Sequence, residues 1–229
     1  MPHAVDHHAI LDKLARTRGG VRNAFTQIDP ARTAHLVIDM QNGFVEPGAP
    51  VEVPAARGVV DNINRICRAV RAGGGLNVFV RFTTPDGDAP AWPVFVERMG
   101  EAIGEHHRAF TRGAHMWQLW PELDVEPGDI EIDKVRFSAF TPGASGLDAL
   151  LRERGIDTVI VTGTLTNCCC ESTARDAMQL NYRVLIAVDA NAALSDEEHA
   201  ATLHTMAFVF ADLYSTDELV AKLKAAVAA

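Results

Sequence analysis

The chain has 229 residues, of which 48% are hydrophobic and 22% are charged, and its formal net charge at pH 7 is −9. This balance is typical of a soluble globular protein and excludes disordered and collagen-like chains. The negative charge argues against nucleic acid and anionic membranes as partners, because both select a positive protein surface.

The four cysteines are Cys67 and the run of three at 168–170. Neighbouring cysteines cannot join distant loops, so they match no extracellular disulfide framework. The first twenty residues mix His, Asp, Lys and Arg without the apolar run of a signal peptide, and no later stretch has the length of a membrane span. The sequence therefore predicts a cytoplasmic protein, with an N-terminal arm over residues 1–30 and one domain over residues 31–229.

Short runs rich in Val and Ile alternate along the chain with longer amphipathic segments. This alternation predicts an α/β three-layer sandwich, with a mostly parallel six-stranded sheet and helices on both faces. The strands are expected at residues 35–40, 76–82, 130–132, 157–163, 183–190 and 211–215. The main helices are expected at residues 57–71, 146–154, 169–180 and 195–207, with a last one from residue 216.

Local signals support three of these helices. Glu171 and Arg175 have the spacing of an ion pair on one helical face. Ser195 and Glu198 have the spacing of a capping box, and Thr216 is expected to cap the last helix.

Three loop regions lack clear periodicity: residues 46–54, 83–93 and 106–120. Loops of that length in an α/β domain are usually lids, binding segments or subunit contacts.

Reactive residues follow three of the expected strands. Asp39 ends the first strand, Lys134 follows the third, and the fourth leads through Thr164 into the cysteine run. Ligands of open α/β sheets bind at the carboxyl ends of the strands, so an acid, a base and a thiol are expected to share one crevice.

A thiol at the start of a helix meets free backbone N–H groups and the positive end of the helix dipole, which lower its pKa. With Asp39 as proton carrier and Lys134 beside it, such a thiol could transfer an acyl group. Each residue also has an ordinary structural role: a buried cysteine fills space, an aspartate caps a turn and a lysine is solvated. The spacing alone does not decide which cysteine reacts.

Three segments resemble the isochorismatase-like cysteine hydrolase superfamily: HLVIDMQNGFVEPG, which contains Asp39, DKVRFSAF, which contains Lys134, and VTGTLTNCCCESTARDA. The resemblance extends over residues 33–216. Aligned on the family's last motif, Cys169 occupies the position of the nucleophile, and its two neighbouring cysteines occupy positions usually held by small apolar residues.

The resemblance implies a catalytic triad of Asp39, Lys134 and Cys169. It also implies a cis peptide bond between Thr164 and Leu165, with the backbone N–H groups of Leu165 and Cys169 forming an oxyanion hole. A homodimer or homotetramer is expected, and no cofactor.

Nicotinamidases of this superfamily bind a metal through an Asp-x-His pair near the second strand. The corresponding stretch here, TTPDGDAPAW, has Asp86 and Asp88 but no histidine, so no catalytic metal is expected. The pairs 106/107 and 199/204 do not place two imidazoles on one helical face, and these histidines are expected at the solvated surface.

The remaining features are similar to the metal-free branch that contains ureidoacrylate and N-carbamoylsarcosine amidohydrolases. The RFTTPDG segment departs from that branch, because it lacks the Asn or Trp used on the ureido group. The expected pocket wall consists of Phe44, Arg81, Thr83, Trp117 and Phe137. Arg81 is interpreted as a carboxylate clamp or an ion-pair partner, and the two aromatic residues Trp117 and Phe137 as pocket, core or subunit contacts.

The sequence thus predicts a cysteine-dependent hydrolase that cleaves a C–N bond of a small amide, carbamoyl or ureido substrate through a thioester. One alternative is a hydrolase of a larger cyclic amide, such as a lactam or an amidated antibiotic. The other is a non-catalytic binding or redox-sensing protein that uses its three thiols.

Overall fold

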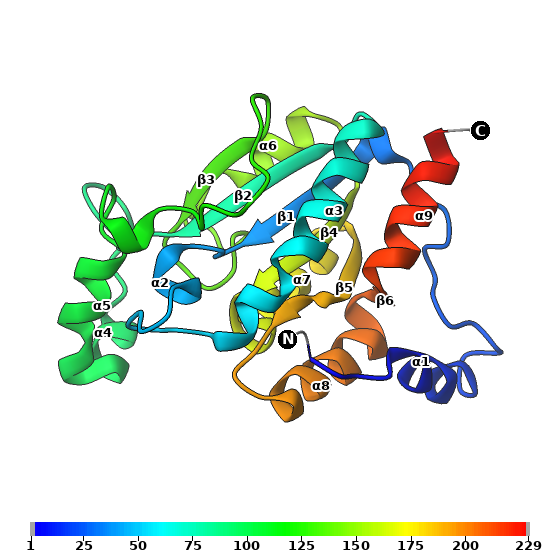
Figure 1. Cartoon of the computed structure of the whole chain (residues 1–229), viewed down its shortest axis with the longest axis horizontal. Coiled ribbons are helices and arrows are strands. Elements are labelled where there is room, and N and C mark those ends of the chain that lie inside the picture. The colour runs from blue at the N-terminus through cyan, green and yellow to red at the C-terminus, as the bar shows by residue number, and fades with distance from the viewer. Residues whose placement is uncertain (1–2, 228–229) are drawn as a thin grey trace.

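The computed structural model describes residues 3–227; residues 1–2 and 228–229, at the ends of the expected arm and domain, lie outside it. Six parallel strands form one sheet in the order β3-β2-β1-β4-β5-β6 (Figure 1). The strands are β1 Thr33–Ile38, β2 Leu76–Phe82, β3 Ile130–Lys134, β4 Thr158–Thr164, β5 Arg183–Ala192 and β6 Asp212–Tyr214. The predicted sheet is confirmed, and it is parallel throughout.

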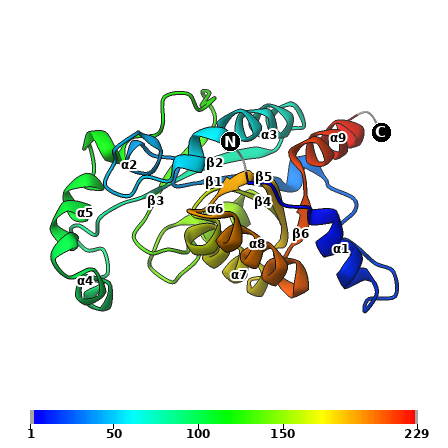
Figure 2. The ribbon, with the colours of Figure 1, turned by 60° about the horizontal axis from the view of Figure 1, so that its bottom comes forward.

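Helices cover both faces of this sheet (Figure 2). Helices α3 (Val60–Ala72) and α9 (Thr216–Val227) lie on one face, and α6 (Leu147–Glu153), α7 (Glu171–Gln179) and α8 (Asp196–Thr205) lie on the other. The other α-helices of the described chain are α1 His7–Ala15, α2 Asn42–Val45, α4 Pro93–Met99 and α5 Ile103–Ala109. The predicted three-layer sandwich is therefore confirmed.

The central strands are apolar because no face of them meets water. Every residue of β1 and of β4 is buried. Their side chains point alternately into two apolar clusters, one under α3 and α9 and the other under α6, α7 and α8. The chain crosses from one half of the sheet to the other in the connection from β3 to β4, so the strand order reverses between β1 and β4, which is where the ligand sites of such sheets form.

Strand ends differ from the expected ones where the chemistry lies. The first strand was expected to run through Asp39, but it ends at Ile38, because Asp39 has a left-handed backbone with φ 52°. β3 continues two residues beyond its expected end, to Lys134. The segment Thr166–Cys170 forms a π-helical turn that precedes α7, so Cys169 lies before the α-helix rather than at its first residue.

The predicted ion pair between Glu171 and Arg175 is present, at 2.7 Å. The predicted cap of α8 is present as well, since the Glu198 amide donates to Ser195 Oγ at 3.2 Å. The predicted cap of α9 was wrong: Thr216 is the first residue of that helix and donates to Asp189 at 2.7 Å.

The residue before it, Ser215, caps α9 instead. The amide of Glu218 donates to Ser215 Oγ at 3.2 Å, and the amide of Ser215 donates to Glu218 Oε2 at 2.7 Å. The capping box is therefore displaced by one residue from the position that the sequence indicated.

The irregular region 83–120 carries α4 and α5 at one end of the molecule, beyond the carboxyl ends of β1 and β2 (Figure 1). Within residues 3–227 no helix has the length and apolar character needed to cross a membrane.

Candidate active site

Asp39, Lys134 and Cys169 meet at the carboxyl edge of the sheet, although they lie up to 130 positions apart in the chain. Lys134 Nζ donates to Asp39 Oδ2 at 2.8 Å and to Cys169 Sγ at 3.4 Å. Its third N–H donates to the backbone carbonyl of Arg136 at 3.1 Å. All three protons of the ammonium group are thereby directed, so Lys134 holds the carboxylate and the sulfur in one place.

The Asp39–Lys134 pair is completely buried, with both side chains 0% exposed. Burial raises the pKa of Asp39 above its ordinary value, although Lys134 opposes this effect. Burial lowers the pKa of Lys134, but Asp39 and Cys169 together outweigh burial, so that pKa lies above its ordinary value. The pair is thus an ammonium beside a carboxylate that is more basic than a solvated one.

The second oxygen of that carboxylate, Asp39 Oδ1, is buried and has no hydrogen-bond partner among residues 3–227. Buried polar atoms are nearly always hydrogen-bonded, so an unpaired one needs a reason. A carboxylate oxygen of raised basicity, next to a thiol and without a donor, has the properties of a proton acceptor.

The pKa of Cys169 differs from the expectation. A hydrogen bond with Cys168, burial and the Asp39 carboxylate raise this pKa well above its ordinary value, against the charge of Lys134. The prediction that the helix start lowers this pKa was wrong, because the thiol is buried in a turn ahead of α7 and faces a carboxylate. The resting thiol is protonated and needs a base to become a nucleophile.

The three consecutive cysteines have different surroundings. Cys168 is partly exposed, whereas Cys169 and Cys170 are buried. Burial raises the pKa of Cys170 well above its usual value, and its Sγ contacts the carbonyl of Thr162 at 3.9 Å. Only Cys169 receives the hydrogen bond from Lys134.

The turn that carries Cys169 is shaped by its backbone. The peptide bond between Thr164 and Leu165 is cis. The Leu165 carbonyl accepts hydrogen bonds from the amides of Cys168 at 3.1 Å and Cys170 at 3.2 Å. The turn therefore wraps around the Leu165 carbonyl, with Cys169 between the two donors.

Gly163 allows β4 to approach β1 immediately before this turn. Its φ is +114°, and a Cβ atom there would lie 2.1 Å from the carbonyl oxygen of Ile38. Only glycine fits this position, because it combines a left-handed backbone with a backbone contact.

A buried histidine, which no sequence pattern indicated, holds the first residue of the turn. His199 Nε2 contacts the carbonyl of Val188 at 3.0 Å, and its Nδ1 contacts Thr166 Oγ1 at 2.9 Å. A carbonyl only accepts, so the ring proton lies on Nε2 and Thr166 donates to Nδ1. Burial lowers the pKa of His199 to about 4, so the ring is neutral.

The prediction that these helix histidines are solvated is thus wrong for His199, which is fully buried, and for His106, which is 8% exposed. Burial lowers the pKa of His106 to about 4. His204 is exposed, as expected. The spacing argument concerned metal ligation and carried no information on which helix face packs inward.

Phe44 and Phe137 are packed among other aromatic rings. The Phe44 ring lies 4.7 Å from that of Phe110, inside the core under α3. The Phe137 ring is partly buried and meets Trp92 edge-on at 4.8 Å. Of the two, Phe137 packs against the core cluster that contains Cys169, whereas Phe44 belongs to the other cluster.

Arg81, Thr83 and Trp117 form a cluster of their own. The Arg81 guanidinium lies 3.9 Å from the centre of the Trp117 ring and pairs with Asp133 at 3.0 Å and Glu131 at 2.7 Å. The Trp117 indole donates to Thr83 Oγ1 at 2.8 Å. Arg81 is therefore an ion-pair partner, which is one of the two roles that the sequence left open for it; the other was a carboxylate clamp.

An aromatic pocket of about 190 Å³ lies beside the triad, and its residues were absent from the expected pocket wall. The Phe82 ring, 5.0 Å from Lys134 Nζ, forms the wall that the pocket shares with the triad. The lining residues are Phe82, Pro85, Ala91, Trp92, Phe95, Val96 and His107. Most come from the irregular loop and α4, where periodicity gives no indication of which side chains face inward.

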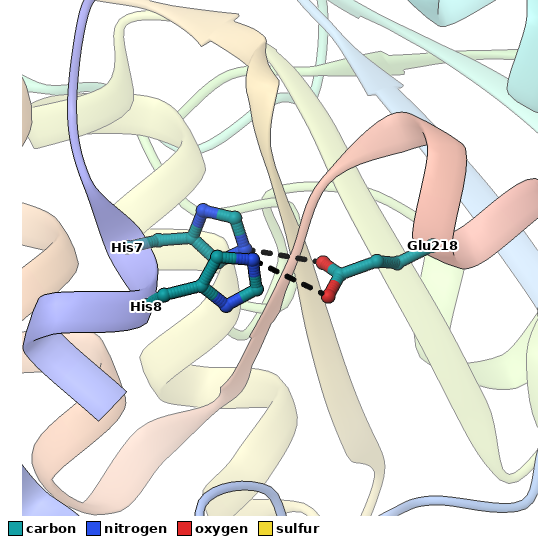
Figure 3. A group of neighbouring side chains, drawn as sticks. All are labelled: His7, His8 and Glu218. Carbon is teal, nitrogen blue, oxygen red and sulfur yellow. Dashed lines mark hydrogen bonds and ion pairs between the residues drawn. The ribbon is translucent and has the colours of Figure 1, made fainter. Parts of the chain in front are cut away.

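Asp86 and Asp88 show no metal-ligand arrangement; Asp86 lies 3.6 Å from Arg112. Within the described chain one group has the geometry of metal ligands, His7, His8 and Glu218 (Figure 3), and it contains no triad residue.

Comparison with known proteins decides the family. The profile of the isochorismatase domain matches residues 33–218. The chain belongs to the isochorismatase family. A ureidoacrylate amidohydrolase RutB from Pseudomonas savastanoi pv. phaseolicola is 32% identical to this family member over 215 residues, which is 84% of each chain.

Two solved structures of the isochorismatase fold show the same architecture. A cysteine hydrolase from Pseudomonas syringae pv. phaseolicola superposes with a TM-score of 0.78 at 30% identity, over 87% of this chain and 95% of the other. An N-carbamoylsarcosine amidase from Thermoplasma acidophilum superposes with a TM-score of 0.67 at 26% identity, over 81% and 97%.

Proposed function

We propose that this isochorismatase-family protein is a cysteine hydrolase that cleaves a C–N bond of a small ureido, carbamoyl or amide substrate. The observation that carries the proposal is the contact of one buried ammonium with both a carboxylate and a thiol, in Lys134, Asp39 and Cys169. The relatives named as ureidoacrylate amidohydrolase and N-carbamoylsarcosine amidase support the substrate class.

The first half of the reaction forms a thioester. Asp39 takes the proton of Cys169 while the sulfur attacks the substrate carbonyl carbon. The carbonyl oxygen becomes an oxyanion, which we assign to the backbone N–H groups of Leu165 and Cys169. When the C–N bond breaks, Asp39 returns its proton to the leaving nitrogen, which departs as ammonia or an amine.

The second half consumes water. Asp39, again ionised, takes a proton from a water molecule that attacks the thioester carbonyl. The C–S bond breaks, the Cys169 sulfur regains the proton, and the acid product leaves. Lys134 remains protonated throughout, since Asp39 and Cys169 together hold its pKa above the ordinary value and one of the two carries negative charge at each stage.

Two variants test the proposal with a panel of ureido acids, carbamoyl amino acids, aryl amides and lactams. Cys169→Ala is expected to abolish ammonia or amine release, while its circular dichroism spectrum stays that of the wild type. Asp39→Asn is expected to lose turnover as well, because the protonated thiol then lacks its base, whereas wild type quenched in acid during turnover is expected to show an acyl adduct on Cys169 by intact-mass spectrometry.

Product release by Cys169→Ala would refute the proposal. Turnover of lactams alone would favour the cyclic-amide alternative. The absence of turnover, together with equal alkylation of all three cysteines, would favour the thiol-binding or redox-sensing alternative.

A further inference from the structure

Two histidines of the N-terminal segment converge on the first turn of α9. His7 and His8 begin α1, and Glu218 lies 211 positions after His7. Figure 3 shows both imidazoles turned toward the Glu218 carboxylate, one nitrogen toward each oxygen. The distances are 3.1 Å from His7 Nε2 to Oε2 and 3.8 Å from His8 Nε2 to Oε1.

The longer of these distances is not explained by a hydrogen bond, because it exceeds the range of N–H···O contacts. Within residues 3–227, Glu218 Oε1 accepts no hydrogen bond, whereas Oε2 accepts from Ser215 and His7. The capping box of α9 therefore accounts for one oxygen of the carboxylate and leaves the other facing His8.

The three donor atoms have the spacing of metal ligands. Zinc binds imidazole nitrogen at about 2.0–2.1 Å and carboxylate oxygen at about 2.0–2.2 Å, so neighbouring ligands in a tetrahedral site are about 3.4 Å apart. The distance of 3.8 Å from His8 Nε2 to Oε1 is close to that value, whereas the 3.1 Å from His7 Nε2 is measured to the other carboxylate oxygen, and one donor atom from each of the three residues lies within 4.8 Å of the others. We propose that His7 Nε2, His8 Nε2 and Glu218 Oε1 bind a divalent transition-metal cation of the zinc type, which ties α1 to α9.

Arg22 affects whether His8 can bind the cation. Its Nη2 donates to His8 Nδ1 at 2.9 Å. A guanidinium only donates, so the neutral His8 ring carries its proton on Nε2, the atom that faces the carboxylate. Metal binding needs the lone pair at Nε2, so the ring proton moves to Nδ1 and Arg22 turns away, toward Asp12, which its Nε already contacts at 3.1 Å. The cation and Arg22 therefore compete for His8.

The chain contains a matched control. His115 pairs through Nε2 with Glu46 at 2.6 Å, and its side chain is 64% exposed, but it does not belong to any three-ligand group of the described residues. It provides an imidazole against a carboxylate without the second imidazole. His8, with a side chain 52% exposed, can be replaced without opening the core.

The test uses the full chain, stripped of metal with a chelator that is then removed, and titrated with zinc chloride by isothermal titration calorimetry. His8→Ala and His7→Ala are each expected to weaken one zinc site by at least about tenfold, and His115→Ala is expected to leave it unchanged. Arg22→Gln is expected to tighten it. All variants keep the three cysteines, so any zinc bound by thiols is common to them and cancels in the comparison.

Cobalt gives a second readout that does not depend on activity. Cobalt bound by imidazole and carboxylate is expected to show weak visible bands that disappear in His8→Ala, without the intense near-ultraviolet band of a thiolate ligand. Zinc at about 100 times its dissociation constant is expected to raise the Tm of the wild type by about 5 °C, and that of His8→Ala by less.

Zinc affinity that is equal in wild type and His8→Ala would overturn the proposal. So would an Arg22→Gln variant that binds zinc no more tightly, since it would contradict the competition for His8. These results are independent of whether the triad hydrolyses ureido compounds.

Discussion

Replacing Lys134 with methionine is expected to make the stability of the protein fall as the pH rises. The substitution keeps the length and packing of the side chain but removes the ammonium group that Asp39 contacts, and Asp39 is 0% exposed. Removing one partner of a buried ion pair costs about 3–5 kcal/mol, because the other charge is left uncompensated. This cost exists only while Asp39 is ionised in the folded state.

The sign of the pH dependence follows from the raised pKa of Asp39. Burial already raises this pKa with Lys134 present, and without the ammonium the folded variant holds the proton to higher pH. The unfolded chain releases that proton near pH 4. Between the two pKa values the folded state binds one proton more, so the free energy of unfolding falls by about 1.4 kcal/mol per pH unit. The loss continues until the folded variant ionises, and its total is limited by the cost of about 3–5 kcal/mol for the uncompensated charge.

Urea unfolding followed by circular dichroism at several pH values measures this slope. The control is the double variant Asp39→Asn/Lys134→Met, which lacks the carboxylate and retains every other titrating group of the single variant. The single variant is expected to lose stability relative to the double variant as the pH rises. Parallel stability curves for the two variants would refute the assignment of Asp39 as a buried group that depends on Lys134.

Three further predictions concern the cysteine turn. Gly163→Ala is expected to lower the free energy of unfolding, measured with urea, by more than about 3 kcal/mol, because the new Cβ would meet the carbonyl of Ile38. A loss below about 1 kcal/mol would contradict this prediction. Thr166→Val leaves His199 Nδ1 without a donor, so it is expected to lower the free energy of unfolding by about 1–3 kcal/mol and to lower kcat more than it changes KM. Thr166→Ser keeps the hydroxyl and is expected to retain the wild-type stability and kcat. Equal behaviour of the two variants would exclude a role of the Thr166–His199 hydrogen bond in positioning the cysteine turn. Cys168→Ala removes the largest contribution to the raised pKa of the neighbouring thiol, so the pH midpoint of Cys169 alkylation is expected to move down. An unchanged midpoint would show that the hydrogen bond with Cys168 does not set this pKa.

Local sequence patterns were sufficient to predict the fold. Uninterrupted apolar runs such as residues 33–38 and 158–164 occur in strands covered on both faces, and the alternation of such runs with amphipathic segments leaves few arrangements besides a parallel sheet between helices. Because parallel strands share one carboxyl edge, the positions of Asp39, Lys134 and the cysteine run after three strands also predicted where they would meet. The choice of Cys169 as the predicted nucleophile came from the family motif around it, because its position in the sequence did not distinguish it from the two neighbouring cysteines.

Tertiary structure decided what depends on contacts between distant segments. The pKa of Cys169 is raised by the hydrogen bond with Cys168, by burial and by a carboxylate 130 positions away, and the last two cannot be derived from the position of a thiol near a helix start. The orientation of His199 toward Thr166 depends on which face of α8 packs against the cysteine turn. The convergence of His7 and His8 on Glu218 depends on how the two ends of the chain pack together. The periodicity of apolar residues in the sequence indicates whether a side chain is buried. The residue that this side chain contacts is determined only when the whole chain has folded.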